Sequence, residues 1–310
     1  MLSRRQLALA LASAAFAPGL AVGQEPEPEP TSIIGAGEDR YDRLTIPVRV
    51  GGQGPYDFVV DTGADRSVLS QDIADSLGLE PGKPVIVQGI VGAELTQTVK
   101  APELDLGRIV LKGLDMPVLP RERLGADGLL GVDALQRRRL IMDFRERRLE
   151  IQAASGAFYP NSTRTDAFVP VRDRFGRLVI IDANANRVPV AAFIDSGAGM
   201  SIGNRALADA IRARGDWRDS APLAPLYGVT SHEATGEVRR LDFVRLGGVR
   251  FTDIPVLIAD LDLFEQWGVA NRPTLLLGVD VLRLFSRVEM DYGRKRVMFR
   301  VGADPQIWLA

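Results

Sequence analysis

Cysteine is absent from the 310-residue sequence and histidine occurs once, at His232. Without thiols the chain forms no disulfide bond, cysteine nucleophile or cysteine-ligated zinc site. One imidazole is also too few for a metal centre built from histidines, so we expect no metal and no cofactor. The catalytic chemistry open to this chain therefore comes from carboxylates, hydroxyls, amides and the backbone.

An excess of one charge is also missing, because 38 basic and 40 acidic residues give a net charge of −2. A surface that coats nucleic acid needs a clear basic excess, so we expect no nucleic-acid partner. Hydrophobic residues make up 46% of the sequence, which is sufficient for a buried core.

The N-terminal residues show the pattern of an export signal. Arg4 and Arg5 precede an alanine-rich apolar run over residues 7–22 that ends in small residues, as in a cleaved signal peptide. Residues 3–7 (SRRQL) also resemble a bacterial twin-arginine signal. We expect residues 1–23 to be a signal peptide and the protein to be exported, to the periplasm. A start codon placed too far upstream and a retained membrane anchor are the alternatives.

Residues 24–39 are expected to form a linker, because residues 24–30 alternate proline and glutamate (QEPEPEP) and favour an extended chain. From Arg40 onward the sequence is rich in β-forming residues, with glycines between the runs. We expect strands at residues 44–50, 56–60, 85–87 and 109–111, and a hairpin turn at residues 51–55. Short helices are expected at residues 71–77, 133–138, 204–212 and 280–285.

The sequence contains an internal repeat of four segments in the same order. Residues 58–64 (FVVDTGA), 115–119 (DMPVL), 129–135 (LLGVDAL) and 142–144 (MDF) return as 193–198 (FIDSGA), 253–257 (DIPVL), 276–282 (LLGVDVL) and 290–292 (MDY). The repeat indicates two copies of one all-β domain related by a pseudo-twofold axis. We assign an N-terminal lobe to residues 40–157 and a C-terminal lobe to residues 158–310.

Each copy presents one aspartate, Asp61 or Asp195, after an apolar strand and before a glycine turn. A pseudo-twofold arrangement would bring the two carboxylates together at the interface between the lobes. Carboxylates about 3 Å apart share one proton, so that one activates a water while the other polarises a carbonyl. The sequence therefore predicts a carboxylate pair that hydrolyses peptide bonds.

Residues 61–69 (DTGADRSVL) resemble the active-site signature of retropepsin-like aspartic proteases, and the two Leu-Leu-Gly segments resemble the second signature of that family. The resemblance covers both halves and implies two acid-protease lobes in one chain, active as a monomer on polypeptide substrates. It implies Asp61 and Asp195 as the catalytic dyad. The supporting residues that it implies in the catalytic loops are Thr62, Gly63, Ala64, Ser196, Gly197 and Ala198.

The resemblance also implies flaps that cover the cleft and bind substrate. The first corresponds to residues 88–92 (QGIVG), and the second, less typical, begins at Tyr227 and Gly228. The residues implied in flap and substrate binding are Gly89, Ile90, Val91, Gly92, Tyr227 and Gly228. His232 is expected on an exposed hairpin. Alanine at positions 64 and 198, in place of a hydroxyl residue, favours a weakly acidic optimum rather than a strongly acidic one.

Three alternatives stay open. The chain could be a peptide-binding or scaffold module that keeps this fold without catalysis, or its lobes could pair between two chains. Residues 199–203 (GMSIG) also match the G-x-S-x-G pattern of serine hydrolases. That interpretation is weaker, because Ser201 occupies the repeat position of Ser67. We read Asp65, Asp133 and Asp280 as helix caps rather than metal ligands.

Overall fold

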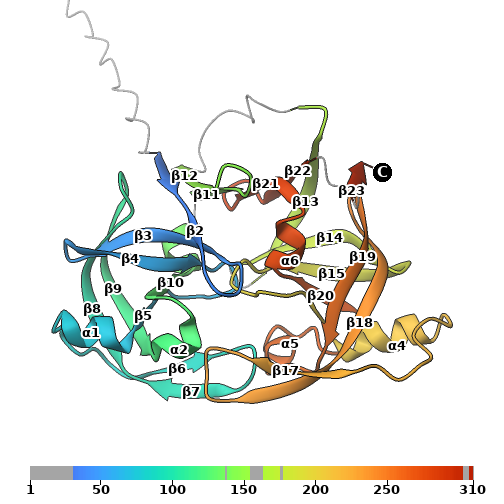
Figure 1. Ribbon diagram of the computed structural model, residues 1–310, viewed down its shortest axis with the longest axis horizontal. Coiled ribbons are helices and arrows are strands. Elements are labelled where there is room, and N and C mark those ends of the chain that lie inside the picture. The colour runs from blue at the N-terminus through green and yellow to red at the C-terminus, as the bar shows by residue number, and fades with distance from the viewer. Residues whose placement is uncertain (1–30, 137, 154–162, 175–176, 303–306, 310) are drawn as a thin grey trace, which may run out of the picture.

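The computed structural model describes residues 31–136, 138–153, 163–174, 177–302 and 307–309. The expected signal peptide, residues 24–30 of the expected linker and the expected boundary between residues 157 and 158 lie outside these residues. Two β-rich lobes stand side by side, with the loops that follow β4 and β15 facing each other between them (Figure 1). Among the described residues, no helix has the length and apolarity to span a membrane.

The N-terminal lobe is a seven-stranded sheet in the order β2-β3-β4-β10-β5-β9-β8, which curls round because β3 also pairs with β8. A separate hairpin of β6 and β7 extends from it. The elements are β2 (Gly37–Glu38), β3 (Leu44–Val50), β4 (Gln53–Val60), β5 (Val68–Ser70), α1 (Gln71–Ser76), β6 (Val85–Gln88), β7 (Ala93–Thr96), β8 (Thr98–Asp105), β9 (Val110–Leu119), α2 (Arg121–Leu124), β10 (Gly128–Leu130) and α3 (Val132–Leu135).

The C-terminal lobe repeats this plan, and it curls in the same way because β14 also pairs with β18. Its last strand pairs with β19. The elements are β14 (Arg177–Ala185), β15 (Val188–Ile194), β16 (Ile202–Gly203), α4 (Arg205–Arg212), β17 (Leu223–Tyr227), β18 (Glu233–Leu246), β19 (Val249–Ile258), α5 (Asp262–Gln266), β20 (Thr274–Leu277), α6 (Val279–Leu282) and β23 (Ile307–Leu309).

Six antiparallel strands from both halves form a sheet that joins the lobes, here called the interlobe sheet (Figure 1, top). Its centre is the pairing of β11 with β21, in which Leu140 lies opposite Met290. Alternate residues of these strands belong to the main hydrophobic core. The strands, in order, are β1 (Ser32–Gly35), β12 (Arg148–Ala153), β11 (Arg138–Asp143), β21 (Phe285–Asp291), β22 (Arg296–Val301) and β13 (Asp166–Arg174).

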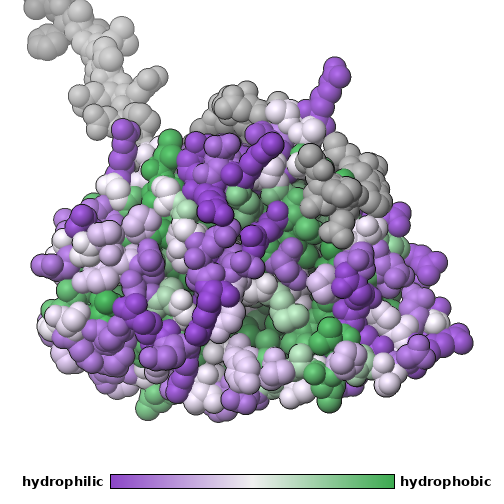
Figure 2. All heavy atoms as spheres, viewed as in Figure 1, coloured by the Kyte–Doolittle hydropathy of each residue, from purple (hydrophilic) through white to green (hydrophobic). Residues whose placement is uncertain are grey.

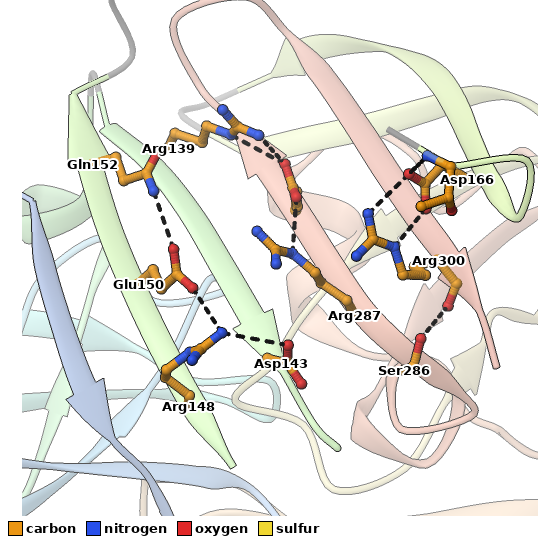
Figure 3. Close-up of polar contacts among 11 residues, drawn as sticks. Arg139, Asp143, Arg148, Glu150, Gln152, Asp166, Ser286, Arg287 and Arg300 are labelled. Carbon is orange, nitrogen blue, oxygen red and sulfur yellow. Dashed lines mark hydrogen bonds and ion pairs between the residues drawn. The ribbon is translucent and has the colours of Figure 1, made fainter. Parts of the chain in front are cut away.

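The other face of the interlobe sheet carries a network of arginines and carboxylates (Figure 3). Arg139 of β11 and Arg287 of β21 both bind the buried carboxylate of Glu289, the latter at 2.9 Å. Arg300 binds Asp166 at 2.7 Å on the C-terminal side. Because a buried carboxylate without its partners is strongly unfavourable, the Arg139–Glu289 pair favours this register between the two halves.

The all-β class and the two-lobe repeat are confirmed. The expected strands and helices are present, but α3 and α6 end three residues earlier than expected, and Arg138 and Phe285 already begin strands. The expected turn at residues 51–55 is also shorter, because β4 begins at Gln53. The expectation that the folded part begins at Arg40 was wrong. Ser32–Gly35 pairs with β12 and Gly37–Glu38 pairs with β3, so these residues belong to the sheets rather than to the linker. A four-residue edge strand beside a charged linker leaves no periodic signal, and only its long-range pairing defines it.

Candidate active site

The two repeated loops begin where β4 and β15 end. Each of these strands lies parallel to the Leu-Leu-Gly strand of its own lobe, β10 or β20. The backbone N–H of Asp61 donates to Leu130 and that of Asp195 donates to Leu277, each at 3.0 Å. The buried pair of strands therefore fixes the root of each loop and presents its aspartate between the lobes.

Asp61 and Asp195 come together at the interface, each against the backbone of the opposite loop. A Cβ atom added to Gly63 would lie 2.5 Å from the carboxyl carbon of Asp195, and one added to Gly197 would lie 2.3 Å from that of Asp61. No side chain fits at such distances, so glycine at both positions permits the approach. The two aspartates are only 8% and 5% exposed.

Thr62 and Ser196 hold the loops together through reciprocal hydrogen bonds. The hydroxyl of Thr62 donates to the carbonyl of Ile194 at 3.1 Å, and the hydroxyl of Ser196 donates to that of Val60 at 2.6 Å. Each hydroxyl oxygen also accepts from the opposite backbone, at 3.0 Å from the N–H of Ser196 and at 3.2 Å from that of Thr62. Both side chains are buried, so this network of hydrogen bonds, here called the Thr62–Ser196 network, fixes the distance between the aspartates.

Backbone N–H groups support the carboxylates from within their own loops. Gly63 and Ala64 both donate to Oδ1 of Asp61 at 2.9 Å, and Gly197 donates to Oδ1 of Asp195 at 2.9 Å. The methyl groups of Ala64 and Ala198 add no hydrogen-bond donor. The carboxylates therefore receive only backbone N–H donors from these positions, as the sequence suggested.

Burial raises the pKa of both carboxyl groups above the ordinary aspartate value, because desolvation disfavours their charged forms. The pKa of Asp195 rises to about 7, first through burial and next through the negative charge of Asp61. At Asp61 the positive charge of Arg43 and the N–H groups of its loop oppose the rise in pKa. The pair therefore retains one proton in weakly acidic solution and titrates as a unit.

Two arginines that the sequence analysis missed hold the loops from the outside. Arg43 donates to the carbonyl of Gly197 at 3.2 Å, and Arg177 donates to the carbonyl of Gly63 at 2.7 Å. Each reaches into the other lobe, and each precedes its own aspartate by the same interval, in the segments 43–46 (RLTI) and 177–180 (RLVI). This fifth match between the halves was the signal that could have revealed them.

The two arginines have different carboxylate partners. Arg177 binds Asp65 of the opposite lobe at 2.9 Å, whereas Arg43 binds Asp39 of its own lobe at 2.6 Å. The repeat position of Asp65 is Gly199, which lies close to Tyr41. The two arginines are therefore equivalent in their contacts with the opposite loop but not in their carboxylate partners. Asp65 acts here as an ion-pair partner rather than as a helix cap.

Ser67 and Ser201 occupy equivalent buried positions, as the repeat predicted. The hydroxyl of Ser67 donates to Asp133 and that of Ser201 donates to Asp280, each at 2.8 Å. The serine-hydrolase interpretation of Ser201 therefore lacks support, since its hydroxyl serves a carboxylate and the only histidine lies on a hairpin. The helix-cap interpretation of Asp133 and Asp280 was wrong, because the N-cap positions of α3 and α6 are glycines. Each aspartate instead accepts from the backbone N–H of the neighbouring catalytic loop.

Two hairpins cover the dyad side of the molecule (Figure 1, bottom). The first flap is β6, residues 89–92 and β7; the second is β17, residues 228–232 and the start of β18. At their tips the hydroxyl of Thr230 donates to the carbonyl of Val91, and the N–H of Ser231 donates to Glu94 at 2.8 Å. Both hairpins therefore meet in a closed arrangement.

The residues that the resemblance placed in the flaps fall into different surroundings. Gly89, Ile90, Val91 and Gly92 form the tip of the first flap, and Gly228 lies against Ile90. Tyr227 belongs to the edge strand β17 and is 61% exposed. His232 is exposed on the second hairpin, as expected, and lies against Gly92, where a Cβ atom would come within 2.4 Å of the imidazole Cγ.

The first flap is also anchored to α5 of the opposite lobe. The N–H of Gly92 donates to Asp262 at 2.9 Å, and Gln266 donates to Gln88 at 2.8 Å.

In the described part of the chain, no group of three or more histidine, aspartate or glutamate residues is arranged to hold a metal ion. The two flaps thus lie over a pair of buried carboxyl groups whose pKa values are both raised.

A comparison with protein families matches the chain twice to the family described as aspartyl protease, at residues 46–134 and 181–281. The first match contains Asp61 with β10 and the first flap. The second contains Asp195 with β20 and the second flap. Each lobe thus matches the family once, and the two matches together cover more than half of the sequence.

Proposed function

This chain belongs to the aspartyl protease family, and we propose that it is an endopeptidase in which Asp61 and Asp195 hydrolyse peptide bonds as one dyad. The observation that carries the proposal is the approach of each carboxylate to the glycine of the opposite loop. Two carboxylates so close and so buried retain a single proton, which supplies a base and an acid at one place. Both halves of the dyad come from one chain, which supports activity as a monomer.

The mechanism follows from that shared proton. The ionised carboxylate takes a proton from a water that lies between the two groups, and the oxygen of this water attacks the peptide carbonyl. The protonated carboxyl group polarises the carbonyl oxygen, and the nitrogen then leaves with a proton. The Thr62–Ser196 network keeps both carboxylates in place throughout the reaction, because its hydrogen bonds do not have to rearrange.

The substrate would be an extended polypeptide that lies between the dyad and the flaps. The flap tips bring the apolar side chains of Ile90, Val91 and Val229 to the two lobes. The closed flaps must open to admit the chain, and their closure over it would exclude water from the dyad. Export by the N-terminal signal would place this activity in the bacterial periplasm.

Incubation with a diverse peptide mixture across pH, read by mass spectrometry, tests the proposal. We expect cleavage in the weakly acidic range by a species that elutes as a monomer. Asp61→Asn and Asp195→Asn, each nearly isosteric, should lower kcat by about 10²–10⁴-fold because either one removes acid–base catalysis. The exposed Asp219→Asn is the matched control.

Peptide binding without cleavage in the unmodified protein would instead identify a binding module. Activity found only in a dimer would mean that the lobes pair between chains. Activity unchanged in either dyad variant would overturn the mechanism.

A further inference from the structure

Two separate apolar clusters lie beside the dyad, one in each lobe. The cluster of the N-terminal lobe, here called the aliphatic cluster, is formed by Val59, Val68, Leu119, Leu124, Ala126 and Leu129. The cluster of the C-terminal lobe, here called the aromatic cluster, includes Phe193, Ile202, Leu257, Phe264, Trp267 and Leu276. Each contains the residue two positions before a dyad aspartate, so each is adjacent to the catalytic centre.

The two clusters occupy equivalent positions of the repeat. Val59, Val68, Leu119 and Leu129 correspond to Phe193, Ile202, Leu257 and Leu276. Two of these four positions carry a larger side chain in the C-terminal lobe, and the other two carry leucine in both lobes. The segment between the last two positions is also longer there, and it supplies Phe264 and Trp267 from α5 and its end. The C-terminal cluster is therefore bulkier on a similar backbone.

The flap tips cross over to these clusters. Val229 of the second flap packs against the aliphatic cluster of the N-terminal lobe. Ile90 and Val91 of the first flap pack against the aromatic cluster of the C-terminal lobe. Each cluster thus lies against a flap tip, and a substrate that displaced the tips would bring its own side chains against the clusters.

Trp267 is held on three sides. Its ring stacks on Phe193 with centroids 4.5 Å apart and meets the edge of Phe264 at 6.5 Å. The guanidinium of Arg177 lies 4.9 Å from the ring centroid, and the same guanidinium binds the carbonyl of Gly63 in the catalytic loop. A ring fixed in this way does not move aside for a large substrate group, because close-packed side chains tolerate little added volume.

We propose that Trp267 determines the specificity of this site by making the two sides of the cleft unequal. The side formed by the C-terminal lobe takes a small side chain of the substrate, and the side formed by the N-terminal lobe takes a large apolar one. The inference rests on the proposed function, since it assigns a substrate class to the same site. The preferred substrate is then a polypeptide with a large and a small apolar residue on opposite sides of the scissile bond.

The test uses a peptide library varied at the two residues that flank the cut. Cleavage is measured with the unmodified protein, and binding with the Asp61→Asn variant, so that a readout exists without hydrolysis. Trp267→Leu should raise acceptance of large residues on one side of the cut by about tenfold and leave the other side unchanged. Leu124→Trp should lower the acceptance of large residues on the opposite side of the cut.

Trp217→Leu is the matched control, because Trp217 packs against the main core and donates to the carbonyl of Arg240 instead. Thermal unfolding verifies that each variant is folded, and Trp267→Phe serves if the leucine variant is not. Equal preference at both positions in the unmodified protein, or a Trp267→Leu profile identical to it, overturns the inference alone. Absence of both cleavage and binding overturns it together with the proposed function.

Discussion

Arg177 in the first position of β14 donates two hydrogen bonds to the carbonyl oxygen of Gly63, at 3.1 Å from Nε and 2.7 Å from Nη2. The arginine belongs to the C-terminal lobe and the glycine to the loop that carries Asp61. The contact thus couples the position of one lobe to the loop geometry of the other. It also brings a positive charge close to both dyad carboxylates, which lowers their pKa values against the effect of burial.

Replacement of Arg177 should change the pH dependence of activity. In Arg177→Met the pKa values of the dyad rise, so the alkaline limb of kcat/KM moves to higher pH. The loss of both bonds to Gly63 lowers kcat/KM by about 10²-fold, since small displacements of catalytic groups have effects of this size. Arg177→Lys keeps the charge and should retain the position of the alkaline limb while losing activity.

The control for this prediction is Arg187→Met, because Arg187 is an exposed arginine at the turn after β14. An alkaline limb that stays in place in Arg177→Met would contradict the electrostatic role.

The Thr62 hydroxyl should matter for stability as well as catalysis. Thr62→Val keeps the shape of the side chain but leaves the carbonyl of Ile194 and the N–H of Ser196 without this partner. We expect a loss of about 1–3 kcal/mol in the free energy of unfolding by urea, the usual cost of unpaired buried polar groups. Thr235→Val, at an exposed position of β18, is the control. Equal stability of the two variants would argue against a stabilising role of the Thr62–Ser196 network.

The stability of the protein should fall as the pH rises from about 4 to about 7. The folded pKa of Asp195 is about 7 and its ordinary value is 3.8, so the folded state binds the extra proton within this window. Stabilisation is complete below pH 4 and is lost as the pH passes through the folded value. The slope attributable to this group approaches about 1.4 kcal/mol for each pH unit.

Asp195→Asn should flatten this dependence and make the variant more stable than the unmodified protein at pH 8. Urea unfolding at pH 4, 6 and 8 measures the effect, with Asp219→Asn as the exposed control. A variant whose stability follows the same pH curve as the unmodified protein would show that the dyad does not carry the raised pKa.

The contact between the flaps should depend on Glu94. Its carboxylate accepts from the N–H of Ser231 and binds Arg123 at 2.9 Å, and the first of these contacts is the largest cause of its lowered pKa. Glu94→Gln should increase hydrogen–deuterium exchange across residues 85–96 by about tenfold, the effect of weakening one charge-assisted hydrogen bond. Glu80→Gln, in an exposed pair with Lys100, is the control. Unchanged exchange would exclude Glu94 from flap closure.

The distribution of polar and apolar side chains on the surface follows the positions of the interlobe sheet and the flaps. Figure 2 shows hydrophilic side chains gathered over the interlobe sheet and apolar patches at the opposite edge, where the flaps lie. The exposed apolar residues of the flap strands are Ile86, Leu95, Leu223 and Tyr227. The burial of these strands alternates, so the exposed residues lie on the outer face of each hairpin, where they have no core to enter.

The sequence by itself determined the all-β class, the duplicated lobes and the two aspartate loops. These features depend on short contiguous segments, because a strand, a glycine turn and an aspartate at its tip are specified by neighbours in the chain. The repeat then required that Asp61 and Asp195 be treated alike, and their equivalence could be read without coordinates. The equivalence of Ser67 and Ser201 could be read from the repeat for the same reason.

Only the tertiary structure decided how those loops are held and covered. The contacts of Arg43 and Arg177 with the opposite loops, the β1 strand and the crossing of the flap tips all join residues that are distant in sequence. Such contacts depend on side-chain reach and on the register between strands of different lobes, which no local pattern encodes. The raised pKa of Asp195 belongs to this class, since burial and the proximity of a second carboxylate exist only after the lobes have packed together.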